Sequence, residues 1–225
     1  VVNSVGKCQD LAKEFSDLNP ICYHSRFTLK DRMEKERTID AKERADDQGA
    51  LLIATQVVEV SLDINFDLLF TECAPPDAVV QRAGRVNRRR TKRDSTVTIC
   101  RASEVSRKIY EPDGTDLLAR AFAAFAAGPK RPTEADLTAI VEQVYAGVGI
   151  ERDPRFLEAS RAYSQSQRRL LGVYDNPILD TTYEVTRKVD YPQVPVIPLQ
   201  FRDAVRDLPP IQRQYYEVKM PLWYV

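Results

Sequence analysis

The sequence has little histidine: His24 is the single one among 225 residues. Zinc hydrolases and two-metal nucleases gather several histidines and carboxylates around their ions, so such a site cannot be assembled from His24 alone. We therefore expect no metal to be bound by this chain. An excess of charge is missing too, because 33 lysines and arginines oppose 33 aspartates and glutamates. Any basic surface for nucleic acid must be local.

No apolar run approaches the roughly 20 residues that span a membrane, and no secretory signal peptide is present. The four cysteines lie far apart without a C-x-x-C pair, which favours buried free thiols in a reducing cytoplasm over disulfides or a zinc site. The chain has no initiating Met and starts on what looks like a core strand. We therefore expect a piece of a longer cytoplasmic protein, either a natural split subunit or a cut fragment.

Short apolar strands alternate with helices over the first 101 residues. Helices are predicted after a cap at Asn3 or Ser4, over residues 29–44 and after a cap at Asp77. Strands are predicted at residues 1–5, 21–23, 51–54, 66–71 and 96–100. This alternation is typical of an α/β domain whose parallel sheet has helices on both faces. Ligands of such sheets bind at the carboxyl ends of the strands, where Ser4, His24 and Thr55 fall.

Residues 102–225 have a different character and predict a smaller, mostly helical annex with a few strands. Helices are predicted over residues 117–127, from Pro132 or Thr133 onward, and over residues 156–171. The last 50 or so residues are rich in proline and β-formers, with strands predicted at residues 183–189, 194–199 and 215–220. We therefore place a domain boundary after residue 101.

A cluster of arginines follows the strand predicted at residues 66–71. About two helical turns carry the following set: Gln81, Arg82, Gly84, Arg85 and Arg88. Guanidinium groups match phosphate oxygens in pairs, and the glycine lets a ligand approach. The pattern suggests a polyphosphate site, although a basic run can also be a solvated helix face.

Three segments resemble the motifs of a known family. Residues 54–64, Ala-Thr-Gln-Val-Val-Glu-Val-Ser-Leu-Asp-Ile, resemble motif V of superfamily 2 helicases. Residues 81–88, Gln-Arg-Ala-Gly-Arg-Val-Asn-Arg, resemble motif VI, and residues 24–32 resemble the segment between motifs IV and V. The sequences of the motif V and motif VI segments are most similar to those of the type I CRISPR-associated helicase-nuclease. The resemblance implies a second RecA-like domain over residues 1–101 and part of that family's C-terminal region over residues 102–225.

The resemblance also implies roles at the nucleotide. Arg85 and Arg88 would be arginine fingers that reach the ATP γ-phosphate. Gln81 and Gly84 would lie beside the nucleotide, and Asp63 stands where relatives place an acid near the ribose. Asp63 could equally be an aspartate that closes a turn between a strand and a helix.

A second set of residues would contact the tracked single strand of DNA. The resemblance places Ser4, Ser25 and Thr55 at its backbone, and short hydroxyl groups at strand ends suit phosphate oxygens without sequence preference. His24 could join them or be a satisfied structural group. Arg26 could bind phosphate or pair with acids of the same segment.

The sequence has no G-x-x-x-x-G-K-[ST] loop, so another RecA-like domain must hold most of the ATP and its Mg²⁺. The expected whole is a prokaryotic 3′–5′ DNA translocase that helps degrade foreign DNA. Its expected partners are single-stranded DNA, the first RecA-like and nuclease domains of the parent protein, and the CRISPR RNA-guided target-recognition complex. The alternatives are another superfamily 2 DNA or RNA helicase, or a non-catalytic docking module for the target-recognition complex or an inhibitor protein.

Overall fold

The computed structural model describes residues 1–45, 49–59, 64–90, 95–111, 115–149, 156–158, 160–161 and 193–221. The chain forms two compact units, one of residues 1–146 with 196–218 and the other of residues 147–195 with 219–225. Each unit is considered by itself, and the domain boundary predicted after residue 101 stays a prediction. Among the helices described, none is long and apolar enough to cross a membrane.

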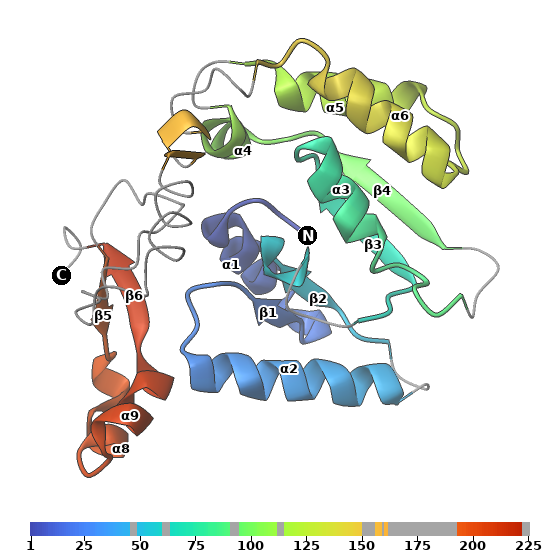
Figure 1. The fold of residues 1–225 in the computed structure, drawn as a ribbon. Coiled ribbons are helices and arrows are strands. Elements are labelled where there is room, and N and C mark those ends of the chain that lie inside the picture. The colour runs from blue at the N-terminus through green and yellow to red at the C-terminus, as the bar shows by residue number, and fades with distance from the viewer. Residues whose placement is uncertain are drawn as a thin grey trace, which may run out of the picture. The chain divides into compact units, whose positions relative to one another are not determined.

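Two pairs of parallel strands form the centre of the first unit (Figure 1). Strand β1 (Ile21–Tyr23) pairs with β2 (Leu52–Ala54), and strand β3 (Leu68–Glu72) pairs with β4 (Thr96–Cys100). These strands lie within one or two residues of their predicted positions. Parallel pairing agrees with the βα alternation of the sequence, because a helix connects each strand to the next parallel one.

The first residues of the chain join the two strand pairs. The N–H of Val2 donates to the carbonyl of Ala54 in β2 at 2.9 Å, and the N–H of Glu72 in β3 donates to the carbonyl of Val1 at 2.9 Å. Residues 1–3 therefore run between β2 and β3. The prediction of a strand over residues 1–5 was wrong, because residues 1–3 make these bonds without forming a strand, Ser4 caps helix α1 (Val5–Glu14) and Val5 is already helical.

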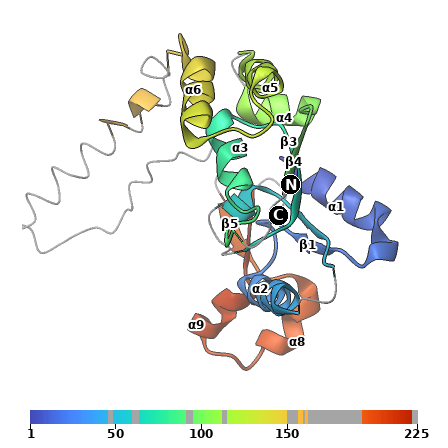
Figure 2. The same cartoon turned by 90° about the vertical axis from the view of Figure 1, so that its right-hand side faces the viewer.

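Helices cover both faces of this layer (Figure 2). Cys8 of α1 packs with Val2 and Ile53 in one buried cluster. Ile39 of α2 (Leu29–Arg44) packs in the other, with Tyr23 and Ala54. Because neighbouring residues of a strand point to opposite faces, Ile53 and Ala54 lie in different clusters. The predicted α/β class with helices on both faces is confirmed.

Helix α3 (Pro76–Ala83) follows β3 directly. Its N-cap is Pro75, with Pro76 at the first helical position, where proline is well tolerated. The prediction that Asp77 caps this helix was wrong, since Asp77 lies inside the first turn. Its carboxylate instead accepts a hydrogen bond from the Tyr145 hydroxyl at 2.6 Å.

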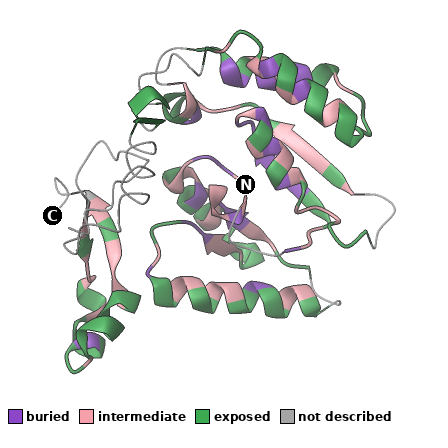
Figure 3. Cartoon of the chain, viewed as in Figure 1, coloured by how far each residue is buried: buried purple, intermediate pink, exposed green. Residues whose placement is uncertain are grey.

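Three further helices follow β4. Helix α4 (Glu104–Tyr110) was not predicted, whereas α5 (Leu117–Ala127) and α6 (Glu134–Tyr145) were. Figure 3 shows the buried stripe of α5, which includes Leu118 and Ala121. Arg120 of α5 donates to the carbonyls of Gln143 and Ala146 at 3.2 and 2.8 Å, and so satisfies the last turn of α6.

The remaining described elements come from the end of the chain. Strand β5 (Gln193–Val196) pairs with β6 (Val218–Pro221). Between them lie η5 (Leu199–Phe201), α8 (Arg202–Val205), α9 (Pro210–Arg213) and η6 (Gln214–Tyr216). The strand predicted at residues 183–189 and most of the helix predicted at 156–171 fall outside the described residues.

Candidate functional site

The arginine-rich motif lies at the end of α3. The exposed residue Gly84 ends the helix, and the chain then lies beside Phe66. The N–H of Phe66 donates to the carbonyl of Arg85 at 2.9 Å, and the N–H of Asn87 donates to the carbonyl of Phe66 at 2.8 Å. These bonds tie residues 85–87 to the segment that enters β3.

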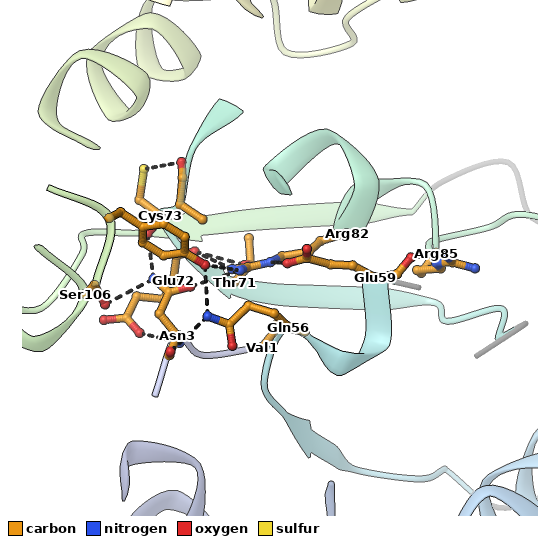
Figure 4. Close-up of polar contacts among 12 residues, drawn as sticks. Val1, Asn3, Gln56, Glu59, Thr71, Glu72, Cys73, Arg82, Arg85 and Ser106 are labelled. Atoms are coloured by element: carbon orange, nitrogen blue, oxygen red, sulfur yellow. Dashed lines mark hydrogen bonds and ion pairs between the residues drawn. The ribbon is translucent and has the colours of Figure 1, made fainter. Parts of the chain in front are cut away.

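Arg82 is completely buried, although it lies within this basic run. Its Nε donates to the carboxylate of Glu59 at 2.7 Å. One terminal nitrogen donates to the Thr71 hydroxyl and to the Glu72 carbonyl, both at 3.0 Å, and the other donates to Asn3 Oδ1 at 2.9 Å and to the Tyr110 hydroxyl at 3.5 Å. All five N–H donors of a guanidinium therefore have an acceptor. Figure 4 shows this network.

Glu59 contacts two arginines of the motif. It ends the 3-10 helix η2 (Gln56–Glu59), which follows β2. Its carboxylate is 13% exposed and forms the ion pair with Arg82. Its backbone carbonyl accepts a hydrogen bond from Nη2 of Arg85. Figure 4 places the side chain of Glu59 between those of Arg82 and Arg85. The motif V segment and the motif VI segment thus meet at one residue.

Glu72 extends the network under the N-terminal segment. Its carboxylate is buried and accepts from the N–H of Asn3 at 3.0 Å, from the N–H of Ser103 at 2.8 Å and from the Lys7 ammonium at 3.2 Å. Burial alone raises the pKa of Glu72, but hydrogen bonds from Ser103, Asn3 and Ser106 outweigh burial and lower the pKa to about 2. Glu72 is therefore a carboxylate at neutral pH.

The candidate nucleotide residues differ in exposure. Gln81, Gly84 and Arg88 are exposed, and Arg85 is half-buried against Glu59. Asp63 lies outside the described residues. The guanidinium groups of Arg85 and Arg88 are donors of the kind that phosphate needs, so this set fits one side of a nucleoside triphosphate. Their roles stay predictions.

The candidate DNA residues gather at one edge of the sheet. Ser4 follows the N-terminal segment, His24 and Ser25 follow β1, and Thr55 follows β2. The parallel register of Tyr23 with Ala54 brings the ends of β1 and β2 together, and the N–H of Thr55 donates to the Tyr23 carbonyl at 3.2 Å. The sheet topology therefore brings these positions into one row.

Their side chains are not equally accessible. Ser25 and Arg26 are exposed, and Ser4 is half-buried with its hydroxyl accepting from the N–H of Lys7 at 3.3 Å. Thr55 and His24 are each 3% exposed. Ser25 and Arg26 are thus the members of the row that solvent reaches most freely. The DNA contacts of the row stay predictions.

His24 has the partners of a structural group. Its ring stacks on Phe27 with centroids 4.1 Å apart, and its Nδ1 accepts from the N–H of Arg26 at 3.2 Å. Burial, followed by the charges of Arg26 and Lys35, lowers the pKa of His24 below 6.5. A neutral ring that accepts at Nδ1 holds the turn that presents Ser25 and Arg26.

Sequence reasoning missed five members of the site, of which two are buried and three are half-buried: Asn3 and Glu72, and Gln56, Glu59 and Tyr110. It also grouped Arg82 with the phosphate-facing arginines. One signal could have separated Arg82 from them. Pro76, Val79 and Arg82 are spaced by three residues, and all three are buried. That spacing puts Arg82 on the apolar face of α3.

Comparisons with known proteins agree with this geometry. Residues 1–91 match the family described as CRISPR-associated nuclease/helicase Cas3, C-terminal. A Cas3 of Methanocaldococcus jannaschii is 39% identical over 93 residues, which are 40% of this chain and 13% of that protein. A Cas3 of Escherichia coli is 47% identical over 73 residues, 31% of this chain and 8% of that protein. The chain thus spans a small part of these relatives.

Solved structures show the same fold. T. fusca Cas3 with AMPPNP superposes with a TM-score of 0.59 at 22% identity, covering 87% of this chain and 26% of that one. A CRISPR-associated protein superposes with a TM-score of 0.62 at 18% identity, covering 98% of this chain and 32% of that one. The resemblance expected from the motifs is confirmed, because residues 1–91 match the C-terminal model of the Cas3 nuclease/helicases and the Cas3 relatives are similar over segments of 73 to 93 residues.

Proposed function

We propose that this chain is the second RecA-like domain, with part of the region that follows it, of an ATP-driven DNA translocase of the Cas3 kind. The single observation that carries the proposal is the contact of Arg85 with the Glu59 carbonyl, because it joins the motif VI arginine to the motif V segment. The motif V segment begins at Thr55, in the row of candidate DNA residues. A displacement of Arg85 at the nucleotide can thus be transmitted through the Glu59 carbonyl and the backbone of residues 55–59 to the candidate DNA residues.

In this proposal, ATP with Mg²⁺ binds mainly on another RecA-like domain and supplies a γ-phosphoryl group for transfer to water. Arg85 and Arg88 approach that group and stabilise the charge that develops on it. Gln81, Gly84 and Asp63 lie beside the nucleotide. Ser4, Ser25, Arg26, Thr55 and His24 form or support half of a track for single-stranded DNA, along which the protein moves 3′ to 5′.

The proposed partners follow from the relatives. One neighbour, with a TM-score of 0.53 at 19% identity, belongs to a CRISPR RNA-guided surveillance complex in a pre-nicking state. We propose that the full protein, in the prokaryotic cytoplasm, acts with such a target-recognition complex and with its own nuclease and first RecA-like domains in antiviral defence.

The experiment replaces the proposed finger in the full-length protein. Arg85→Ala should lower DNA-stimulated ATP turnover by about 10³-fold or more, because an arginine finger stabilises the transition state and contributes little to ground-state binding. The ATP dissociation constant should change only a few-fold. Initial rates of phosphate release and fluorescence titration with an ATP analogue give the two quantities.

The matched control is Arg107→Ala. Arg107 is an exposed arginine on α4 that pairs with Glu104 at 3.6 Å and lies outside the network. Its removal should leave ATP turnover unchanged. Wild-type turnover in Arg85→Ala would show that Arg85 is no finger and would refute the proposal.

A further inference from the structure

We propose that Glu59 and the buried Arg82 are positioning residues that hold the guanidinium of Arg85 in its working place. The inference rests on the proposed function of Arg85 and names the residues through which the fold controls it. The two halves of Glu59 do different things: its carboxylate is held by Arg82, and its carbonyl holds Arg85.

The first step is the rigidity of Arg82. A guanidinium at 0% exposure with acceptors for all five N–H groups has one orientation, because any rotation breaks buried hydrogen bonds. Its acceptors come from the N-terminal segment, from η2, from β3 and from α4. Arg82 is thus fixed to several elements at once and is a firm anchor.

The second step is the weakness of the turn that carries Glu59. Helix η2 has four residues, and short 3-10 turns have poor hydrogen-bond geometry. The N–H of Val58 reaches the Thr55 carbonyl at 3.4 Å, a long bond. The 2.7 Å bond between Arg82 Nε and the Glu59 carboxylate is therefore the stronger restraint on this residue.

The third step connects this restraint to the finger. Arg85 is a long side chain with several rotatable bonds, and ordering it costs entropy. A carbonyl whose position is fixed through Glu59 and Arg82 removes part of that cost before the nucleotide arrives, which is preorganisation. If Glu59 loses its carboxylate, Arg82 no longer holds this residue and the Glu59 carbonyl can move. Arg85 then loses the restraint that this carbonyl provides.

The test compares two ligands in the full-length protein. ADP with aluminium fluoride imitates the phosphoryl group in transfer, whereas ADP alone lacks it. The dissociation constant of ADP divided by that of ADP with aluminium fluoride therefore reports the contribution of the Arg85 finger. Glu59→Ala should weaken binding of ADP with aluminium fluoride by about 10- to 100-fold, the size expected for a charge-assisted hydrogen bond lost in the transition state. Binding of ADP should stay within a few-fold.

Glu59→Gln supplies the conservative variant. Its amide oxygen still accepts from Arg82 Nε, so the dissociation-constant ratio should recover by at least several-fold relative to Glu59→Ala. Tyr23→Phe is the control for a lost buried hydrogen bond, because the Tyr23 hydroxyl donates to Glu36 and contacts neither arginine. It should lower stability and leave the ratio unchanged. The Arg82→Ala variant, where it folds, removes the side chain that holds the Glu59 carboxylate and so disrupts the same contact from the other partner.

The outcomes separate the inference from the function it rests on. A reduced ratio in Arg85→Ala together with a wild-type ratio in Glu59→Ala would overturn the positioning role alone. A wild-type ratio in Arg85→Ala would overturn the proposed function and the inference together. A ratio that falls in Glu59→Ala and recovers in Glu59→Gln supports both.

Discussion

Arg82 and Glu72 are two charged side chains inside the first unit, and each is stabilised by different partners. Arg82 has the carboxylate of Glu59 and four neutral acceptors. Glu72 has the Lys7 ammonium and the backbone N–H groups of Asn3 and Ser103. A buried charge without such partners would cost several kcal/mol, so these contacts are a condition for the fold.

Glu72 should make the stability of the chain depend on acid. Its pKa is lowered from 4.5 to about 2 in the folded chain, so it stabilises the fold fully above pH 4.5 and loses that effect as the pH falls toward 2. The contribution is about 3 kcal/mol at neutral pH. Glu72→Gln should lower the free energy of unfolding at pH 7 and flatten its fall between pH 4.5 and 2.

Urea unfolding of the 225-residue chain at a series of pH values measures this effect. Glu104→Gln is the control, because the Glu104 side chain is 81% exposed and forms an ion pair with the exposed Arg107. It should leave the pH profile unchanged. An acid slope in Glu72→Gln equal to that of the wild type would contradict the hydrogen-bond account of Glu72.

At the scale of elements, helix α6 depends on its first turn. Thr133 accepts from the N–H of Asp136, and Asp136 accepts from the N–H of Thr133 at 2.8 Å, which forms a capping box. Hydrogen bonds from the hydroxyl and then from the N–H of Thr133 lower the pKa of the Asp136 carboxyl. At the other end, Arg120 satisfies the last carbonyls of the helix. Both ends of α6 are thus fixed by side chains.

Thr133→Ala should lower the free energy of unfolding by about 1 kcal/mol, because it leaves the N–H of Asp136 at the start of α6 without its side-chain acceptor. Thr138→Ala is the matched control in the same helix. Thr138 is exposed and its hydroxyl donates to the carbonyl of Glu134, one turn earlier, and alanine has the higher helix propensity. Urea midpoints of the two variants should therefore differ, and equal midpoints would contradict the capping role.

At the scale of the molecule, the proposed function gives this chain one side of a nucleotide site. The 225 residues contain arginines suited to a γ-phosphate and no phosphate loop of the G-x-x-x-x-G-K-[ST] kind. We expect the isolated chain to show no DNA-stimulated ATP hydrolysis under conditions in which the full-length protein turns over. A phosphate-release assay with single-stranded DNA measures both. Appreciable turnover by the isolated chain would refute the half-site interpretation.

Much of the fold could be predicted because its signals are local. Helix α2 was predicted at its observed ends, since the charged residues between 29 and 44 are good helix formers. Helices α5 and α6 and all four strands of the first unit were predicted within two residues. Helix α4 was missed, because it is seven residues long and its burial rests on one residue, Ser106. Short helices owe their stability to tertiary contacts.

The sequence by itself determined the resemblance to the helicase motifs, the alternation of strands and helices, and the presence of arginines after β3, because these depend on residue order and local periodicity. The tertiary structure decided which arginine faces which way. Arg82 and Arg85 are three residues apart and chemically identical, yet one is buried among five acceptors and the other lies at the carbonyl of Glu59. Those acceptors come from positions 3, 59, 71, 72 and 110, and only folding brings such distant residues together.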